Sequence, residues 1–220
     1  MPRVVTIDGP AGAGKSTVAR RVAERLGWRF LDTGAMYRAV TFAALRAETD
    51  LSSDAALARL AEGLDVRLPP SRVLLNGEDV TGPIREPAVT AASRYIADSP
   101  SVRGRLVAWQ RAFAADHDTV TEGRDQGTIV FPDAFRKFYL TASTEERARR
   151  RLAELQARSI VTTLDAVLAD IADRDARDQT RAIAPMRPAE DAKLVDSTGR
   201  ALDEVIDHLI ACIIGGETRP

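Results

Sequence analysis

The sequence predicts an α/β fold in which a five-stranded parallel sheet is flanked by helices. Short apolar runs alternate with longer segments of helical periodicity, which is typical of parallel sheets. A glycine-rich loop follows the first apolar run and precedes the first helical segment. Apolar residues make up 45% of the 220 residues, which is enough for a single core. We therefore expect one domain with room for a small insertion.

Five short runs are the expected strands, because turn or polar residues flank each of them. They are Val4–Ile7, Arg29–Leu31, Thr119–Thr121, Arg136–Leu140 and Leu194–Val195. The segments between them have helical periodicity, as in Val18–Leu26 and in the amphipathic stretch LDAVLADIADRD. Thr162, followed by Asp165, is the expected start of that second helix.

The segment from about residue 42 to 103 interrupts the alternation. Its stretch VRLPPSRVLLNGEDV holds two extended runs joined around Pro69-Pro70, followed by a turn at Asn76-Gly77. This pattern predicts a small antiparallel sheet followed by helix. We interpret the segment as an inserted domain.

Charge and cysteine content limit the partners and the setting. The formal net charge of −1 gives no overall attraction to nucleic acids or acidic membranes, so we expect neither as a partner. Cys212 is the only cysteine, which excludes an intramolecular disulfide and favours a reducing compartment. The sequence shows no secretory leader and no apolar run of membrane-spanning length. A cytoplasmic monomer is the expectation.

The glycine-rich loop matches the phosphate-binding pattern G-x-x-x-x-G-K-[ST] at every fixed position. Its residues, with the following Thr17, are Gly9, Pro10, Ala11, Gly12, Ala13, Gly14, Lys15, Ser16 and Thr17. Such a loop turns backbone N–H groups toward phosphate oxygens, while the lysine bridges the outer phosphates and the Ser16 hydroxyl ligates Mg²⁺. The pattern predicts a site for a nucleoside triphosphate but does not identify the reaction.

The rest of the sequence narrows the choice of reaction. A GTP-dependent switch needs an Asn-Lys-x-Asp element to read guanine, and the chain has none. A motor ATPase needs an aliphatic run that ends in aspartate, and no convincing one is present. Kinases that act on small acceptors remain.

Three polar motifs follow the loop. FLDTGAMYR and TVTEGRDQGT each lie at the end of an expected strand, where ligands of open α/β folds bind. ADRDARDQTR places Arg174, Asp178 and Arg181 on one helix face. Each motif alone also fits an ordinary turn or a solvated row of salt bridges, since Asp178 can pair with either arginine of its helix.

Taken together and in this order, the motifs resemble the bacterial type of cytidylate kinase. The elements DTGAMYR, EGRDQGT and RDARDQTRAIAP match the family's patterns, and LNGEDVTGPIREPAV and IVFPDA are also similar to family sequence. The resemblance extends from Val4 to about Val205. It departs at Gln126, where the family usually has an aliphatic residue, and in the segment from Ser93 to Arg103, which is one residue longer than expected.

The resemblance implies phosphorylation of CMP and dCMP by ATP with Mg²⁺. It implies a P-loop kinase core at about 1–41 and 104–220, a nucleoside-monophosphate-binding insertion at about 42–103, and a lid at about 147–162. One of Arg149, Arg150 and Arg151 is expected to reach ATP from that lid. Lys15, Arg124, Arg174 and Arg181 are the implied catalytic residues.

The implied substrate contacts divide among phosphate, sugar and base. Arg38, Arg124 and Arg181 would hold the acceptor phosphate or the phosphoryl group in transfer. Thr33, Arg174 and Asp178 would lie around the sugar. Ser93, Arg103 and Asp125 would face the cytosine.

Physical chemistry supports these assignments and leaves two alternatives. Arginine grips two phosphate oxygens at once and keeps its proton, and an acceptor phosphate is anionic at neutral pH, so no general base is needed. The Asp125 carboxylate would accept a hydrogen bond from the cytosine amino group and repel the uracil carbonyl. The alternatives are another small-molecule kinase, acting on UMP or an alcohol, and a regulatory module that binds nucleotide without transfer.

Overall fold

The computed structural model describes residues 1–215 and divides the chain into two compact units. The first unit comprises Met1–Phe30 and Asp116–Pro220, and the second comprises Leu31–Ala115. The insertion expected at 42–103 falls within the second unit. Within residues 1–215, no helix combines the length and the apolar character needed to cross a membrane.

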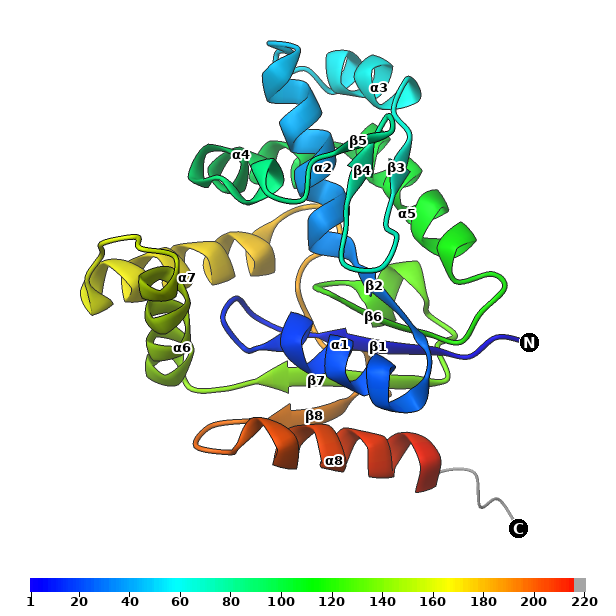
Figure 1. Ribbon diagram of the computed structural model, residues 1–220, viewed down its shortest axis with the longest axis vertical. Coiled ribbons are helices and arrows are strands. Elements are labelled where there is room, and N and C mark those ends of the chain that lie inside the picture. Colours follow the sequence, from blue (N-terminus) through cyan, green and yellow to red (C-terminus); the bar gives the residue numbers. More distant parts are fainter. Residues whose placement is uncertain (216–220) are drawn as a thin grey trace. The chain divides into compact units, whose positions relative to one another are not determined.

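A five-stranded sheet forms the framework of the first unit (Figure 1). Its strand order is β2-β6-β1-β7-β8, and β1 pairs in parallel with β6 and β7, as β7 does with β8. The strands are β2 (Arg29–Asp32), β6 (Thr119–Gly123), β1 (Val4–Asp8), β7 (Arg136–Thr141) and β8 (Lys193–Asp196). All five predicted strands are confirmed, each one or two residues longer than expected.

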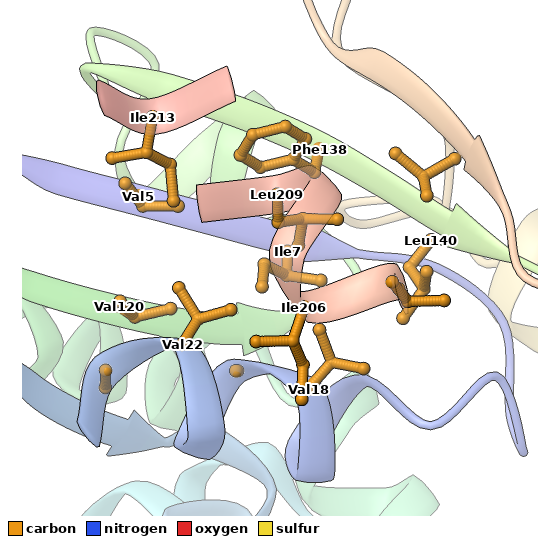
Figure 2. Packing of buried hydrophobic residues seen from close by; sticks show 14 residues of the cluster. Val5, Ile7, Val18, Val22, Val120, Phe138, Leu140, Ile206, Leu209 and Ile213 are labelled. Carbon is orange, nitrogen blue, oxygen red and sulfur yellow. The ribbon is translucent and has the colours of Figure 1, made fainter. Parts of the chain in front are cut away.

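The central position of β1 explains why its sequence is almost continuously apolar. Helices cover both faces of a parallel sheet, so the side chains on both faces of a central strand are buried. Val5 and Ile7 are fully buried, and they pack with Val18 of α1 (Lys15–Leu26) and Leu209 of α8 (Leu202–Ile214), which cover the same face (Figure 2). This core fixes the end of β1 from which the phosphate loop starts.

Two further helices of the first unit, α6 (Thr144–Ala157) and α7 (Leu164–Thr180), pack on each other around the buried residues Ala148, Val167 and Ile171. The predicted helix start needs a correction of one residue. Thr163, not Thr162, is the N-cap, since its hydroxyl accepts the Ala166 N–H at 3.2 Å.

Arg181 is not part of the α7 face on which it was predicted. The helix ends at Thr180, and Arg181 takes an extended conformation with ψ of 141°. The chain then turns back, and the Met186 N–H donates to the Asp178 carbonyl at 2.7 Å. This contact satisfies a carbonyl of the last turn, so the helix stops one residue before Arg181.

The second unit is mainly helical and carries the small sheet predicted for it. Its helices are α2 (Thr33–Arg46), α3 (Asp54–Glu62), α4 (Pro87–Asp98) and α5 (Pro100–Phe113), with a short 3₁₀ turn η1 (Pro83–Arg85). The antiparallel strands are β3 (Val66–Arg67), β4 (Leu74–Leu75) and β5 (Glu78–Asp79). Asn76 and Gly77 have φ of 50° and 85°, as a two-residue hairpin turn requires.

Candidate active site

The phosphate loop connects β1 directly to α1. Gly9 has φ of 148°, and a Cβ at this position would lie 2.0 Å from the Leu140 carbonyl oxygen, so only glycine fits. Gly14 is the N-cap of α1 and provides no side-chain cap, and the first helical turn carries no acidic residue. The first N–H groups of α1 are therefore available to an anion.

Lys15 lies at the start of α1, and its side chain is buried against the loop. Its Nζ donates to the Pro10 carbonyl at 2.7 Å. Burial and the nearby charge of Arg124 lower the pKa of Lys15 to about 7. Ser16 and Thr17, in contrast, are exposed at the same helix start.

Arg124 follows β6 and is held by a carboxylate from α7. Its Nε donates to Asp178 Oδ2 at 2.9 Å, and the two side chains are 20% and 26% exposed. Burial alone would lower the pKa of Arg124, but the carboxylates of Asp178 and Glu122 outweigh it and raise the pKa. Asp178 of α7 is thus bound to an arginine that follows β6, a different element.

Arg174 belongs to the same group of positive charges. Burial, the charge of Arg124 and that of Arg151 lower the pKa of Arg174, although Asp170 lies 3.8 Å away. Lys15, Arg124 and Arg174 are therefore close enough to repel one another. We name these three residues the cation cluster.

Arg181 lies beyond the end of α7, and its Nε donates to the Ala184 carbonyl at 2.6 Å. This bond orients the guanidinium through the backbone of its own loop. The remaining N–H groups of a guanidinium held in this way stay in a fixed plane, which suits a bidentate contact with phosphate.

Asp8, at the end of β1, is a buried carboxylate that the motif analysis did not select. It accepts the N–H groups of Gln126 at 2.9 Å and Gly127 at 2.8 Å, in the π-helical turn η2 (Gln126–Val130). Burial raises the pKa of Asp8 to about 6, although these two bonds oppose the shift. Asp8 thereby fixes the turn that follows Arg124 and Asp125.

Asp125 and Gln126 occupy the same turn and are both buried. The Asp125 carbonyl accepts the N–H groups of Ile129 and Val130, at 2.9 and 3.2 Å. The Gln126 side chain accepts a hydrogen bond from the Thr121 hydroxyl at 2.9 Å. A polar side chain in place of an aliphatic one therefore stabilises the connection of β6 to the turn.

The basic run at Arg147–Arg151 lies on α6, and its members have different surroundings. Arg150 is bound to Glu146 and to the Ser197 hydroxyl, both at 2.9 Å, and Arg149 is exposed. Arg151 pairs with Glu154 at 2.8 Å, and its charge acts on Arg174 as described above. The charge of Arg151 therefore acts on one member of the cation cluster, Arg174.

Two of the predicted substrate residues, Thr33 and Arg38, lie near the start of α2 in the second unit. Asp32 caps this helix by accepting the Ala35 N–H at 2.8 Å, and Thr33 is buried. Arg38 Nη2 lies 3.8 Å from Asp32, and its buried Nε has no hydrogen-bond partner among residues 1–215. A buried donor without a partner favours an anionic ligand at this guanidinium.

Ser93 and Arg103 lie on successive helices of the second unit, α4 and α5. The Ser93 hydroxyl donates to the Thr90 carbonyl of its own helix at 2.8 Å. Arg103 is buried, and its Nη1 donates to the Tyr37 hydroxyl at 3.0 Å and the Ala97 carbonyl at 3.4 Å. Between them, Ser99 ends α4 and caps the start of α5, where its hydroxyl accepts the Val102 N–H at 3.3 Å.

The structure thus brings together the loop and the predicted residues of the first unit: Lys15, Arg124, Arg174 and Asp178. The second unit carries Thr33, Arg38, Ser93 and Arg103. Sequence reasoning missed Asp8 and also Asp175 of α7, which accepts the N–H of Ala11 in the phosphate loop at 3.0 Å. Asp8 is a charged residue at the end of an apolar strand, and Asp175 lies inside the motif that contains Arg174 and Asp178. The sequence could therefore have marked both residues as candidates, although not their partners.

A magnesium ion is implied by the loop, and the residues present fit it. Mg²⁺ keeps several waters and takes one or two protein oxygens together with phosphate oxygens. The exposed Ser16 hydroxyl at the start of α1 is such an oxygen. Residues 1–215 hold no group of three histidine, cysteine or acidic side chains that could bind a metal ion.

Comparisons with known proteins identify the family of the chain. A sequence model described as Cytidylate kinase matches residues 5–214. The chain is 45% identical over 214 residues to a cytidylate kinase of Pasteurella multocida (strain Pm70), covering 96% of this chain and 94% of that protein. It is 48% identical over 214 residues to one of Stutzerimonas stutzeri (strain A1501), covering 94% and 93%.

Among solved structures, an uncharacterized protein from Eubacterium ventriosum ATCC 27560 matches with a TM-score of 0.53 at 10% identity, covering 99% of both chains. This likeness concerns the fold. The sequence relatives go further, because the match spans nearly the whole of each chain. The chain belongs to the cytidylate kinase family.

Proposed function

We propose that this protein transfers the terminal phosphoryl group of ATP to CMP and dCMP, and so forms CDP or dCDP with ADP. The full-length match to cytidylate kinases supports the substrate class. The phosphate loop supports ATP as the donor. The arginines beyond the loop support an acceptor that is itself an anion.

One observation carries the proposal, which is the repulsion within the cation cluster. Lys15, Arg124 and Arg174 lie close enough that Arg124 lowers the pKa of both other residues, in addition to the effect of burial. The carboxylates of Glu122, Asp170 and Asp178 offset only part of this repulsion, since the pKa values of Lys15 and Arg174 stay lowered. A polyphosphate, with several negative charges in a small volume, relieves the repulsion.

The transfer then needs little proton chemistry. A phosphate oxygen of CMP attacks the terminal phosphorus of ATP, the bond from that phosphorus to the bridging oxygen breaks, and ADP leaves with the electron pair. The acceptor oxygen is already anionic at neutral pH. Lys15, Arg124, Arg174 and Arg181 neutralise the charge on the phosphoryl oxygens and hold the reacting atoms in line.

Ser16 is the residue that we assign to Mg²⁺. The bound ion neutralises phosphate charge and orients the outer phosphates of ATP. The N–H groups of the loop hold the same phosphates through the backbone.

For the acceptor, we assign Asp125, Ser93 and Arg103 to the base, and Thr33, Arg174 and Asp178 to the sugar. Arg38, Arg124 and Arg181 take the phosphate. Asp125 supports discrimination because its carboxylate pairs with the cytosine amino group and repels the uracil carbonyl. We also assign monophosphate binding to the insertion at about 42–103 and lid movement to about 147–162. A cytoplasmic setting and a monomeric state stay predictions.

The test is ADP release from ATP and Mg²⁺ by the purified protein, with CMP, dCMP, UMP, AMP, shikimate and gluconate as acceptors. The proposal predicts fast turnover confined to CMP and dCMP. Equal turnover with UMP would keep the kinase and remove base recognition by Asp125. ATP binding without turnover on any acceptor would indicate a regulatory module.

A further inference from the structure

Two charged side chains grip the backbone of the phosphate loop at a single residue, Ala11. The Ala11 N–H donates to Asp175 Oδ1 at 3.0 Å, and the Ala11 carbonyl accepts from Arg147 Nη1 at 2.9 Å. Asp175 lies on α7 and Arg147 on α6. Both polar groups of one loop residue are thus bound by side chains from helices that follow it in sequence by more than a hundred residues.

The two side chains also bind each other. Arg147 Nη1 lies 2.5 Å from Asp175 Oδ2, and the side chains are only 8% and 13% exposed. Arg147 makes two further bonds, to the Ala142 carbonyl at 3.0 Å and to the Thr144 hydroxyl at 3.1 Å. We name Arg147, Asp175 and their contacts to Ala11 the loop clamp.

Stability alone does not explain a pair of this kind. Removing two charges from water is costly, and an apolar pair of similar volume is often equally stable. A buried ion pair with directed hydrogen bonds also holds the groups that it binds in one defined conformation. Here that group is the backbone of the phosphate loop.

The neighbouring residue leaves the loop no room to move toward the helices. A Cβ on Gly12 would lie 3.0 Å from the Arg147 carbonyl oxygen and 3.3 Å from the Ile171 side chain. The loop therefore rests against α6 and α7 directly. The clamp and this packing together hold the segment that precedes the phosphate-binding N–H groups.

Helix α7 links this clamp to Arg124, which is assigned to the acceptor phosphate. Asp175 and Asp178 are three residues apart and so lie on one face of the helix. Asp175 holds the loop, while Asp178 holds Arg124 at 2.9 Å. One rigid element thereby fixes the distance between the loop and the cation cluster.

We propose that Arg147 and Asp175 are positioning residues, which hold Ala11 so that the loop keeps the geometry needed to bind ATP. The assignment rests on the proposed function only in naming ATP as the ligand. It also separates Arg147 from the other arginines of the basic run, since the guanidinium of Arg147 is used within the clamp.

The first test is Asp175→Asn, with Asp173→Asn as the matched control. Asp173 lies on the same helix but is exposed and pairs with Arg177 at the surface. The binding constants of ATP and of CMP are measured separately by titration calorimetry. We expect Asp175→Asn to weaken ATP binding at least tenfold and to change CMP binding less than threefold, with the control within twofold of the parent for both.

Steady-state kinetics give a readout that a purely structural role would not change. A variant that is only less stable has a lower melting temperature and a smaller active fraction, but an unchanged KM for ATP. The proposal predicts a KM for ATP raised at least tenfold in Asp175→Asn. A folded Asp175→Asn protein with the parent's affinity and KM for ATP would overturn the proposal.

A second variant, Arg147→Lys, keeps the charge and removes the planar fork, and Arg177→Lys on α7 is its control. We expect ATP binding to weaken several-fold in the first and to stay unchanged in the second. If neither clamp variant folds, hydrogen exchange of the parent protein decides. Its Ala11 amide must then be strongly protected, and rapid exchange there would contradict the clamp.

These results are separable from the proposed function. If the parent protein binds ATP but phosphorylates none of the acceptors, the proposed function fails. The loss of ATP binding in Asp175→Asn would still support the clamp. If CMP turnover is fast and the clamp variants keep their KM for ATP, the function stands and the clamp fails.

Discussion

Arg124 and Arg147 of the first unit and Arg38 of the second have different surroundings. In the first unit, Arg124 is paired with Asp178 at 2.9 Å and Arg147 with Asp175 at 2.5 Å, so these two guanidinium groups each have a close carboxylate partner. In the second unit, the Arg38 guanidinium lies 3.8 Å from its nearest carboxylate, and its Nε lacks a partner among residues 1–215. Arg103 of the same unit donates to neutral oxygens.

This difference separates arginines whose partners are supplied by the fold from arginines whose donors are available to a bound ligand. Paired arginines contribute to stability as well as to function, since their removal leaves a carboxylate without its partner. An arginine with an unused donor contributes mainly when an anion binds. The first group, Arg124 and Arg147, should therefore show linked losses of stability and function, and the second, represented by Arg38, a loss of binding alone.

The largest effect is expected for Arg124→Ala. Removing a preorganised donor to a developing negative charge lowers kcat by about 10²–10³-fold. ATP affinity should stay within a few-fold of the parent, and the melting temperature should fall because Asp178 loses its partner. Arg177→Ala, at the surface of α7, is the control. Unchanged kcat in Arg124→Ala would remove this residue from the reaction.

Arg38→Ala tests the second group. Loss of a charge-assisted contact to the acceptor phosphate is worth about 1.5–3 kcal/mol, so the KM for CMP should rise roughly ten- to hundredfold. The melting temperature should not fall, which is the contrast with Arg124→Ala. Arg46→Ala, whose side chain pairs with Glu78 on the surface of the same unit, should leave KM unchanged. A marked loss of stability in Arg38→Ala would abolish the distinction between the two groups.

Asp125→Asn addresses the choice of base. An amide can turn its NH₂ group toward the uracil carbonyl, so the preference for CMP over UMP should narrow by about ten- to hundredfold. The comparison of kcat/KM for the two acceptors measures it, and Asp133→Asn, in the exposed loop after the turn, is the control. A parent-like ratio in Asp125→Asn would show that another group reads the base.

The smallest effect concerns the proton on Lys15. Burial and Arg124 lower its pKa to about 7 in the folded protein, against 10.5 for an ordinary lysine. The unfolded chain therefore binds more protons between these values, so this residue makes the free energy of unfolding rise with pH from about 7 to 10.5. Chemical denaturation at several pH values in this range measures how the free energy of unfolding changes with pH.

ATP binding offers a second measurement of the same proton. The phosphates of ATP favour the charged form of Lys15, so binding at pH 8 should take up a proton. Titration calorimetry in buffers of different ionisation enthalpy gives the number of protons taken up when ATP binds. This number should approach one at pH 8 and should be smaller at pH 6, where the lysine already carries its proton. No uptake at pH 8 would mean that Lys15 is charged before ATP binds.

The sequence was sufficient for the sheet and the loop, because both depend on local patterns. Apolar runs marked all five strands, and the glycine spacing marked the turn from β1 to α1. The sequence was not sufficient to predict which side chains pair with the charged residues. The helix periodicity left open that Asp178 pairs with an arginine of its own helix, but its carboxylate binds Arg124, which is 54 residues away.

The loop clamp shows the same limit. Asp175 lies 164 residues from Ala11, and no local pattern indicates that a side chain at such a distance binds the loop backbone. In the sequence, Arg147 is one of four arginines between residues 147 and 151 and lies at the start of the expected lid. Its burial and its bonds to Ala11, Ala142 and Asp175, which the fold provides, distinguish it from the other arginines.

The most direct test of the account is to identify the products that form from ATP, Mg²⁺ and CMP. ³¹P NMR of the reaction distinguishes the β-phosphorus of CDP from inorganic phosphate. The account predicts that CDP and ADP appear in equal amounts and that no inorganic phosphate accumulates. Formation of ADP with inorganic phosphate, and no CDP, would contradict it.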